Sequence, residues 1–164
     1  MPPRFRTDAR ERASFRLIEC DIRDDDALAR AFDGARIGAV VHLAALAGVR
    51  PSLERPAEYA DVNVRGTAVV LEAALRHGLP RVVFASSSSV YGEREAGPFR
   101  ESDAVEKPVS PYAATKRAGE LLCESFCALY PMSVASLRYF TVYGPRQRPD
   151  LAILVPISSR ACTP

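Results

Sequence analysis

RVVFASS, residues 81–87, is the stretch that decides the fold. It is short and mostly apolar and it ends in small hydroxyl residues, a pattern that predicts a buried strand. Three further short apolar runs predict strands of the same kind: FRLIECDI (15–22), AVVHLAA (39–45) and SVASLRYF (133–140). The chain therefore carries four candidate strands.

Helical segments separate these runs. RDDDALARAFDG (23–34) has acids in its first turn and ends at a glycine. PAEYADVNVRGTAVVLEAALRHG (56–78) also ends at a glycine, and SPYAATKRAGELLCESFCALYP (110–131) ends at a proline. Strands that alternate with helices form βαβ units, so the pattern predicts an α/β fold with a Rossmann-like parallel sheet flanked by helices.

Length and composition fit one soluble globular domain: 164 residues, 48% hydrophobic and 26% charged. A net charge of +2 is too small to favour nucleic acid or an anionic membrane surface as a partner. No apolar run approaches the roughly 18 residues of a membrane span, and residues 1–16 contain no signal-peptide stretch. We expect a cytoplasmic protein whose ends, 1–12 and 154–164, pack loosely.

The cysteines and histidines do not predict a metal site. Cys123 and Cys127 share a helix face, but two ligands do not make a site, and packing in the core is the favoured interpretation. Cys20 and Cys162 complete the set, and all four are expected to be free thiols in a reducing compartment. His42 lies inside a predicted buried strand and is expected to be a core histidine.

Candidate site residues gather where the predicted strands end, because ligands of open parallel sheets bind beyond the carboxyl ends of the strands. Tyr112 and Lys116 lie four residues apart on one face of the helix that follows. A cation beside a phenol favours the charged form, which predicts a lowered pKa and a general base. A serine from the run at 86–89 can hold the same substrate oxygen. Taken alone, the pair is equally consistent with two exposed residues on a helix.

Six blocks in order resemble the NAD-dependent sugar-nucleotide epimerase/dehydratase family of extended short-chain dehydrogenase/reductases. They are ECDIRD (19–24), VVHLAALAGVRPS (40–52), NVRGT (63–67), VVFASSSSVYG (82–92), SPYAATKRAGE (110–120) and LRYFTVYGPRQRPD (137–150). SSSSVYG and FTVYGPRQRPD most resemble the UDP-glucuronate 4-epimerases, with the UDP-glucose 4-epimerases close behind.

The resemblance implies NAD as cofactor, a UDP-sugar as substrate and a homodimer as a candidate assembly of the full-length family member. It implies oxidation of the sugar at C4 to a ketone, rotation of this intermediate and reduction from the other face. Tyr112 would be the catalytic base, and Lys116 would bind the nicotinamide ribose and lower the tyrosine pKa. Ser87 would bind the reacting oxygen, with Ser88 and Ser89 as rivals for that role.

The remaining family positions are implied contacts with cofactor and substrate. Asp21 and Ile22 match the pair that contacts the adenine. Asn63 matches a cofactor-binding position, although a helix-kinking structural role is an equal alternative. Other implied contacts are Leu43, Ala44 and Ala45 under the cofactor, and Phe140 and Thr141 lining the nicotinamide and sugar pocket.

The sequence also departs from the family. No three of its nine glycines form Gly-x-x-Gly-x-x-Gly or Gly-x-Gly-x-x-Gly, the turn that binds the pyrophosphate. The match begins at the third strand of the family, so we expect a partial domain without the first two strands and the C-terminal substrate domain. Run 15–22 is then expected to pair directly with 39–45 through the crossover helix 23–34.

Three functions remain open at this stage. The first is a 4-epimerase of UDP-sugars. The second is a truncated, catalytically inactive chain that acts at most as a binding or interaction module. The third is a nucleotide-sugar dehydratase or decarboxylase, against which SSSSVYG counts because the family's dehydratases carry acids there.

Overall fold

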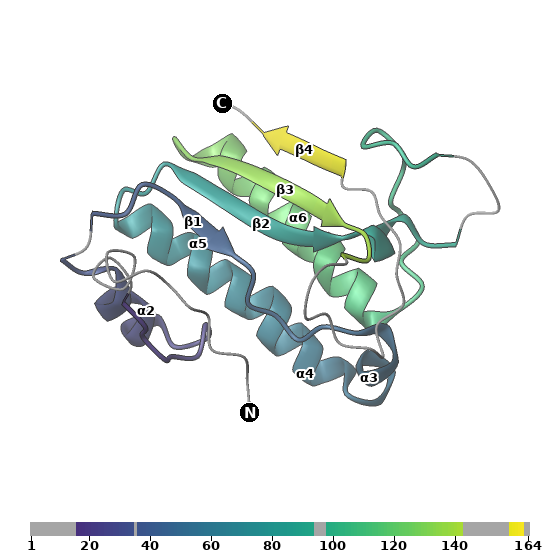
Figure 1. Cartoon of the computed structure of the whole chain (residues 1–164), viewed down its shortest axis with the longest axis horizontal. Helices are drawn as coiled ribbons and strands as arrows, with labels where there is room; N and C mark the ends of the chain where they lie inside the picture. The colour runs from purple at the N-terminus through teal and green to yellow at the C-terminus, as the bar shows by residue number, and fades with distance from the viewer. Residues whose placement is uncertain (1–15, 35, 94–97, 143–157, 163–164) are drawn as a thin grey trace.

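The computed structural model describes residues 16–34, 36–93, 98–142 and 158–162. Its centre is a four-stranded sheet in the order β1-β2-β3-β4 (Figure 1). β1, β2 and β3 are parallel, and β4 is antiparallel to β3. The prediction that the runs 39–45, 81–87 and 133–140 belong to one parallel sheet is therefore confirmed. The strands are β1 Val40–His42, β2 Arg81–Ser87, β3 Ser133–Tyr139 and β4 Ser158–Cys162.

β2 is bonded unequally to its two neighbours. Its whole length pairs with β3, and at the carboxyl end Ser86 is opposite Arg138 and Ser87 is opposite Tyr139. Only three residues of β1 pair with β2, the last being His42. β1 is thus shorter than the predicted run, and the chain leaves the sheet directly after His42.

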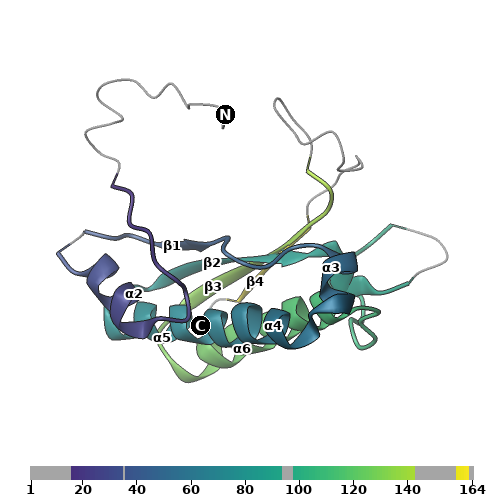
Figure 2. The same cartoon turned by 90° about the horizontal axis from the view of Figure 1, so that it is seen from below.

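Three helices cover one face of this sheet (Figure 2). They are α4 Pro56–Ala60, α5 Gly66–Arg76 and α6 Pro111–Leu129. Between sheet and helices lies the main core, in which Leu71 of α5 and Cys123 and Cys127 of α6 pack against Val82 and Phe84 of β2. The predicted packing role of the two cysteines is confirmed.

α2, Asp25–Phe32, confirms the predicted helix 23–34 within slightly narrower bounds. It begins because the Asp24 carboxylate accepts a hydrogen bond from the Ala27 backbone N–H, at 3.0 Å. Leu28 buries its side chain against Val70 and Ala73 of α5. α2 therefore packs on α5, beside the sheet (Figure 1).

The predicted helix 56–78 is three pieces rather than one. α4 runs into a π-helical turn, η1 Asp61–Arg65, which continues directly into α5. A short helix that the sequence did not predict, α3 Val49–Glu54, precedes them. π-helical turns are rare and are frequently found at functional sites, and this one carries Asn63.

α6 confirms the predicted helix 110–131. Ser110 caps it, since its hydroxyl accepts a hydrogen bond from the Ala113 N–H at 3.1 Å, and Pro111 occupies the first turn. A short 3₁₀ turn, η2 Ser88–Tyr91, follows β2 and starts where the Ser87 hydroxyl accepts from the Ser89 N–H. The helix start and this turn lie at the same end of the sheet (Figure 1).

The prediction for 15–22 is wrong for residues 16–22, which form no strand and do not pair with β1. Local contacts hold the end of this segment elsewhere. Arg23 bonds the Asp21 carboxylate and also the Asp61 carboxylate of η1, at 2.6 Å each. Ile22 lies against Gly66, where an added Cβ would come within 2.6 Å of its Cδ1 atom. Contacts with η1 and α5 thus take the place of a partner strand.

The C-terminal end also differs from expectation. Ser158–Cys162 pair with β3 as β4, where the sequence predicted a loosely packed end. Residues 1–12, 154–157 and 163–164 lie outside the described residues. Within the described part of the chain, no helix is long and apolar enough to cross a membrane.

Candidate active site

Ser87 and Tyr112 meet at the carboxyl end of β2. Ser87 is the last residue of β2, and Tyr112 lies in the first turn of α6. The Ser87 hydroxyl lies close enough to the Tyr112 phenol to lower its pKa, and it lies 3.2 Å from the Ser89 hydroxyl. Among the candidate serines, Ser87 is the one whose hydroxyl acts on the pKa of the tyrosine.

Lys116 lies one helical turn after Tyr112 and is 5% exposed. Its Nζ atom donates a hydrogen bond to the Ala85 carbonyl at 2.8 Å, and lies 5.3 Å from the Phe84 ring centre and 5.9 Å from that of Tyr112. Burial lowers the pKa of Lys116 to about 8. The lysine thus anchors α6 to the end of β2.

The pKa of Tyr112 is raised, which corrects the predicted lowering by Lys116. Burial of the phenol is the largest cause, the hydrogen bond from Ser87 opposes it, and Tyr59 adds to it. The Lys116 ammonium group donates to the Ala85 carbonyl rather than to the phenol, and it is not among the groups that shift this pKa. At neutral pH the phenol is therefore protonated.

Tyr59 is a site neighbour that the sequence reasoning missed. It is 1% exposed, and its ring stands edge-on to that of Tyr112, with the centres 6.3 Å apart. Its hydroxyl donates to the Ala47 carbonyl at 2.7 Å, which fixes the loop after β1. An aromatic residue on a helix gives no sequence signal of such a contact, because core packing has the same pattern.

The contacts of Asn63 favour a structural role over cofactor binding, the two alternatives that the sequence left open. Its Oδ1 accepts from the Leu46 N–H at 2.8 Å, and its Nδ2 donates to the Leu46 carbonyl and to the Thr115 hydroxyl. Thr115 in turn donates to the Tyr112 carbonyl at 2.8 Å. Both donors and the acceptor of this amide are engaged, so Asn63 ties the loop after β1 to the tyrosine helix.

The residues expected under the cofactor lie on the loop that Asn63 holds. Leu43 and Ala44 are exposed, with Leu43 at 62%, and Ala45 is half-buried. Val41 of β1 is exposed as well, at 59%. This end of β1 thus offers an open, apolar surface.

Asp21 and Ile22 lie apart from the tyrosine, on the turn before α2. Asp21 is exposed, and hydrogen bonds from Arg23 lower its pKa to about 2. Ile22 is half-buried against Gly66. The carboxylate of Asp21 is thus engaged by a neighbour in the chain.

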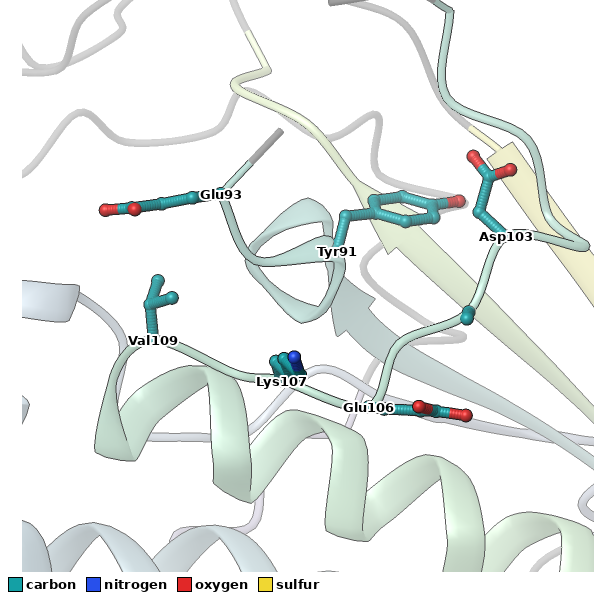
Figure 3. Close-up of a pocket in the computed structure, with 7 residues that line it drawn as sticks. Tyr91, Glu93, Asp103, Glu106, Lys107 and Val109 are labelled. Carbon is teal, nitrogen blue, oxygen red and sulfur yellow. The ribbon is translucent and has the colours of Figure 1, made fainter. Parts of the chain in front are cut away.

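Phe140 belongs to an aromatic cluster on the other side of the site. Its ring centre lies 5.2 Å from that of Phe99 and 6.2 Å from that of Tyr91. Thr141, which follows it, is exposed. A cavity of about 510 Å³ lies beside this cluster, and Ser87 and Tyr112 are not among its lining residues. Those are Tyr91, Glu93, Asp103, Ala104, Glu106, Lys107 and Val109 (Figure 3).

His42 is a core histidine, as predicted. It is 5% exposed, and burial lowers its pKa to about 4. Its Nε2 atom lies 3.0 Å from the Thr67 hydroxyl, which donates its own proton to the Asn63 carbonyl. Nε2 therefore carries the hydrogen and donates to Thr67.

A buried ion pair is the second feature that the sequence reasoning missed. Glu120 and Arg138 are 2% and 1% exposed, and their side chains lie 2.8 Å apart. A signal was present, because Glu120 continues the four-residue spacing of Tyr112 and Lys116 along α6. The partner on β3 could not be identified without the sheet register.

Known proteins resemble this chain over most of its length. A UDP-glucuronate 4-epimerase of Thermodesulfobacterium geofontis is 46% identical over 140 residues, which are 85% of this chain and 43% of that protein. A UDP-glucose 4-epimerase of Thermus thermophilus, solved with NAD, superposes with a TM-score of 0.74 at 40% identity. The match covers 79% of this chain and 42% of that one.

A dTDP-glucose 4,6-dehydratase of Streptomyces venezuelae, solved with NAD, has the same TM-score of 0.74 at 36% identity, covering 82% of this chain and 41% of that one. The chain thus spans less than half the length of these relatives. The family model described as NAD dependent epimerase/dehydratase matches residues 2–162. The chain therefore belongs to the NAD-dependent epimerase/dehydratase family.

Proposed function

We propose that this chain provides the catalytic half of an NAD-dependent 4-epimerase that acts on a UDP-sugar. The observation that carries the proposal is the arrangement at the carboxyl end of a parallel strand, where Ser87 ends β2, Tyr112 lies in the first turn of α6, and the buried Lys116 one turn later bonds the Ala85 carbonyl. A serine and a tyrosine that meet at one point can share one substrate oxygen. The UDP-glucuronate 4-epimerase similar over 85% of the chain favours a UDP-sugar as substrate.

The residues present fit the nicotinamide end of the cofactor. Val41 and Leu43 expose apolar side chains at the end of β1, and Lys116 uses one of its three N–H donors on Ala85. We expect Lys116 to hold the nicotinamide ribose. Leu43, Ala44 and Ala45 would lie beneath the cofactor, Asp21 and Ile22 would contact the adenine, and Phe140 and Thr141 would border the nicotinamide and the sugar.

The pyrophosphate end has no matching group of residues in the sequence. Because no glycine turn of the dinucleotide-binding type is present, few backbone N–H groups are available for the phosphates. We therefore expect the 164 residues alone to bind NAD more weakly than micromolar. Calorimetry with NAD measures this, and a micromolar dissociation constant would contradict it.

The proposed chemistry divides between cofactor and chain. NAD, when bound, supplies the hydride acceptor and donor that turns the C4 alcohol of the sugar into a ketone and back. After its own proton has passed to solvent, Tyr112 as the phenolate would take the proton of the C4 hydroxyl and later return it, and Ser87 would donate a hydrogen bond to the same oxygen. A tyrosine with a raised pKa must first lose its proton, so a positive charge close to the phenol is needed at that step.

The test is product analysis with UDP-glucuronate and UDP-glucose in the presence of NAD. Appearance of the 4-epimer, lost in Tyr112→Phe, would support the proposal. A 4-keto-6-deoxy product would indicate the dehydratase alternative instead. Absence of turnover even at NAD concentrations far above micromolar would favour the non-catalytic binding module.

A further inference from the structure

We propose that Glu120 and Arg138 are positioning residues, whose buried ion pair sets the Ser87 hydroxyl against Tyr112 by fixing the end of β2 on α6. The catalytic meaning of this inference rests on the proposed function. The placement itself rests on contacts within the chain. Neither residue contacts the phenol, so both act through their neighbours.

One stripe of α6 holds three consecutive residues of β2. Tyr112, Lys116 and Glu120 are spaced four residues apart and so lie on one face of the helix. Tyr112 meets Ser87, and Lys116 donates to the Ala85 carbonyl. Glu120 accepts a hydrogen bond from the Ser86 hydroxyl at 2.6 Å. The contact of Glu120 is thus made with the residue directly before the catalytic serine.

Arg138 brings β3 into the same cluster. Ser86 and Arg138 are opposite each other in the β2–β3 register. Arg138 donates from Nε and Nη2 to the two Glu120 oxygens, at 2.8 and 3.0 Å, which is a bidentate fork. Arg117 also donates to Glu120, at 3.1 Å. Glu120 therefore accepts four hydrogen bonds, which come from β2, from β3 and from its own helix and fix the position of its carboxylate.

The guanidinium group also fixes the chain after Ser87. Its Cζ atom lies 4.8 Å from the ring centre of Tyr91, the last residue of η2. Its Nη1 atom donates to the Glu101 carbonyl at 3.3 Å. Ser87 lies between Ser86, which is bonded to Glu120, and η2, which Arg138 contacts through the Tyr91 ring. The serine is thus fixed from both sides by one ion pair.

A buried ion pair suits positioning more than stabilisation. The attraction of two buried charges roughly offsets the loss of their hydration, so such a pair adds little net stability, while its fork geometry is restrictive. Burial alone would raise the pKa of Glu120, but hydrogen bonds from Arg138 and Ser86 leave it below the ordinary value. The carboxylate is therefore ionised and holds its four donors at neutral pH.

The test measures the Tyr112 phenol itself, without cofactor or sugar. 3-Fluorotyrosine placed at position 112 gives one ¹⁹F signal and a more acidic phenol, so its titration is read before the fold is lost at high pH. Ser87→Ala sets the reference: its pKa should rise, because the hydrogen bond that lowers it is gone. Glu120→Gln should raise the pKa in the same direction. Glu124→Gln, the same change one turn later on α6, should leave it unchanged.

Two controls keep the result decisive. If Glu120→Gln does not fold, the double variant Glu120→Gln, Arg138→Met removes both charges, leaves neither unpaired, and should still raise the pKa. An unchanged or lowered pKa in a folded variant would overturn the inference, since it would mean that Ser87 keeps its place or that the site merely opens to water. Absence of epimerase activity in the wild type, together with the expected pKa rise in Glu120→Gln, would leave positioning intact and count against the proposed function alone.

Discussion

The two sides of β2 are built differently. Toward β3, all of β2 is paired. α6 adds two buried contacts on this side: Lys116 bonds the Ala85 carbonyl, and Glu120 forms an ion pair with Arg138, which lies opposite Ser86. Toward β1, three residues are paired, Val41 and Leu43 are largely exposed, and the bonds of Arg23 lie near the surface. The β3 side holds the groups proposed to move the proton, whereas the β1 side holds those proposed to lie under the cofactor.

This difference shows which half of the site is preformed. The groups proposed to transfer the proton are held by side chains buried on α6 and β3, so their geometry does not depend on a ligand. The surface proposed to hold the cofactor is open, and Asn63 and Tyr59 support its loop. We therefore expect substitutions on the β3 side to have the larger effects, and the predictions below test that order.

The largest expected effect is that of Arg138→Met. It leaves Glu120 buried without its bidentate partner, which should lower the free energy of unfolding by about 3–5 kcal/mol. The double variant Glu120→Gln, Arg138→Met should lie much closer to the wild type. On the β1 side, Arg23→Met should change stability far less, because water can solvate the exposed carboxylates of Asp21 and Asp61 once Arg23 is gone. Urea unfolding of the three variants measures the order, and a loss for Arg23→Met equal to that for Arg138→Met would refute it.

The second prediction concerns pH and Lys116. The unfolded chain keeps the lysine proton up to about the ordinary pKa of 10.5, whereas the folded chain loses it near 8. Between these values the unfolded state binds more protons, so the free energy of unfolding should rise with pH, by up to about 3 kcal/mol. Above pH 10 the free energy of unfolding should fall again, because the folded chain keeps the Tyr112 proton while the unfolded chain loses it.

Lys116→Met provides the control for this pH dependence. With no titrating group at 116, the rise between about pH 8 and 10 should vanish, and the variant should be more stable than the wild type at pH 7. Urea unfolding at several pH values measures both. A rise that persists in Lys116→Met would show that another group causes it.

Two glycines make the third, matched comparison. At Gly119 of α6 an added Cβ would overlap the Phe84 ring, which is fixed in the core. Gly119→Ala should therefore cost about 1–3 kcal/mol. At Gly66 the added Cβ would meet the end of the Ile22 side chain, which can turn away, and alanine favours the helix by about 1 kcal/mol. Thermal unfolding of Gly66→Ala should thus show little change, and a loss equal to that of Gly119→Ala would contradict the comparison.

The same division explains what could be predicted from sequence. β2, β3 and α6 follow from local periodicity and end signals, whereas the choice of Ser87 as the partner of Tyr112 follows from the family resemblance. The π-helical turn at Asn63 interrupts a helix without changing its apolar pattern, so the sequence predicts one continuous helix. The Glu120–Arg138 pair depends on a register between β2 and β3 that no local pattern specifies. The raised pKa of Tyr112 depends mainly on how deeply the phenol is buried, which no local pattern specifies either.

The failure at 16–22 has a different cause. An apolar run predicts a strand only if an edge is available to pair with it, and β1 presents three residues. The contacts of Arg23 with Asp61 and of Ile22 with Gly66 hold the end of the segment on η1 and α5. Side-chain contacts thus decided the position of a segment whose apolar composition alone predicts a strand.

The smallest expected effect tests that placement directly. Leu17 is 72% exposed, so Leu17→Ala removes little buried surface and should change the free energy of unfolding by less than about 0.5 kcal/mol. Leu71→Ala is the matched control, because the same atoms are removed from a site that is 1% exposed, and it should cost about 2–5 kcal/mol. If 16–22 instead paired with β1 in solution, the Leu17 side chain would be buried between the sheet and the helices, and Leu17→Ala would cost more than about 1 kcal/mol. Urea unfolding of both variants distinguishes a free segment from a paired strand, because only a paired strand makes Leu17→Ala measurably destabilising.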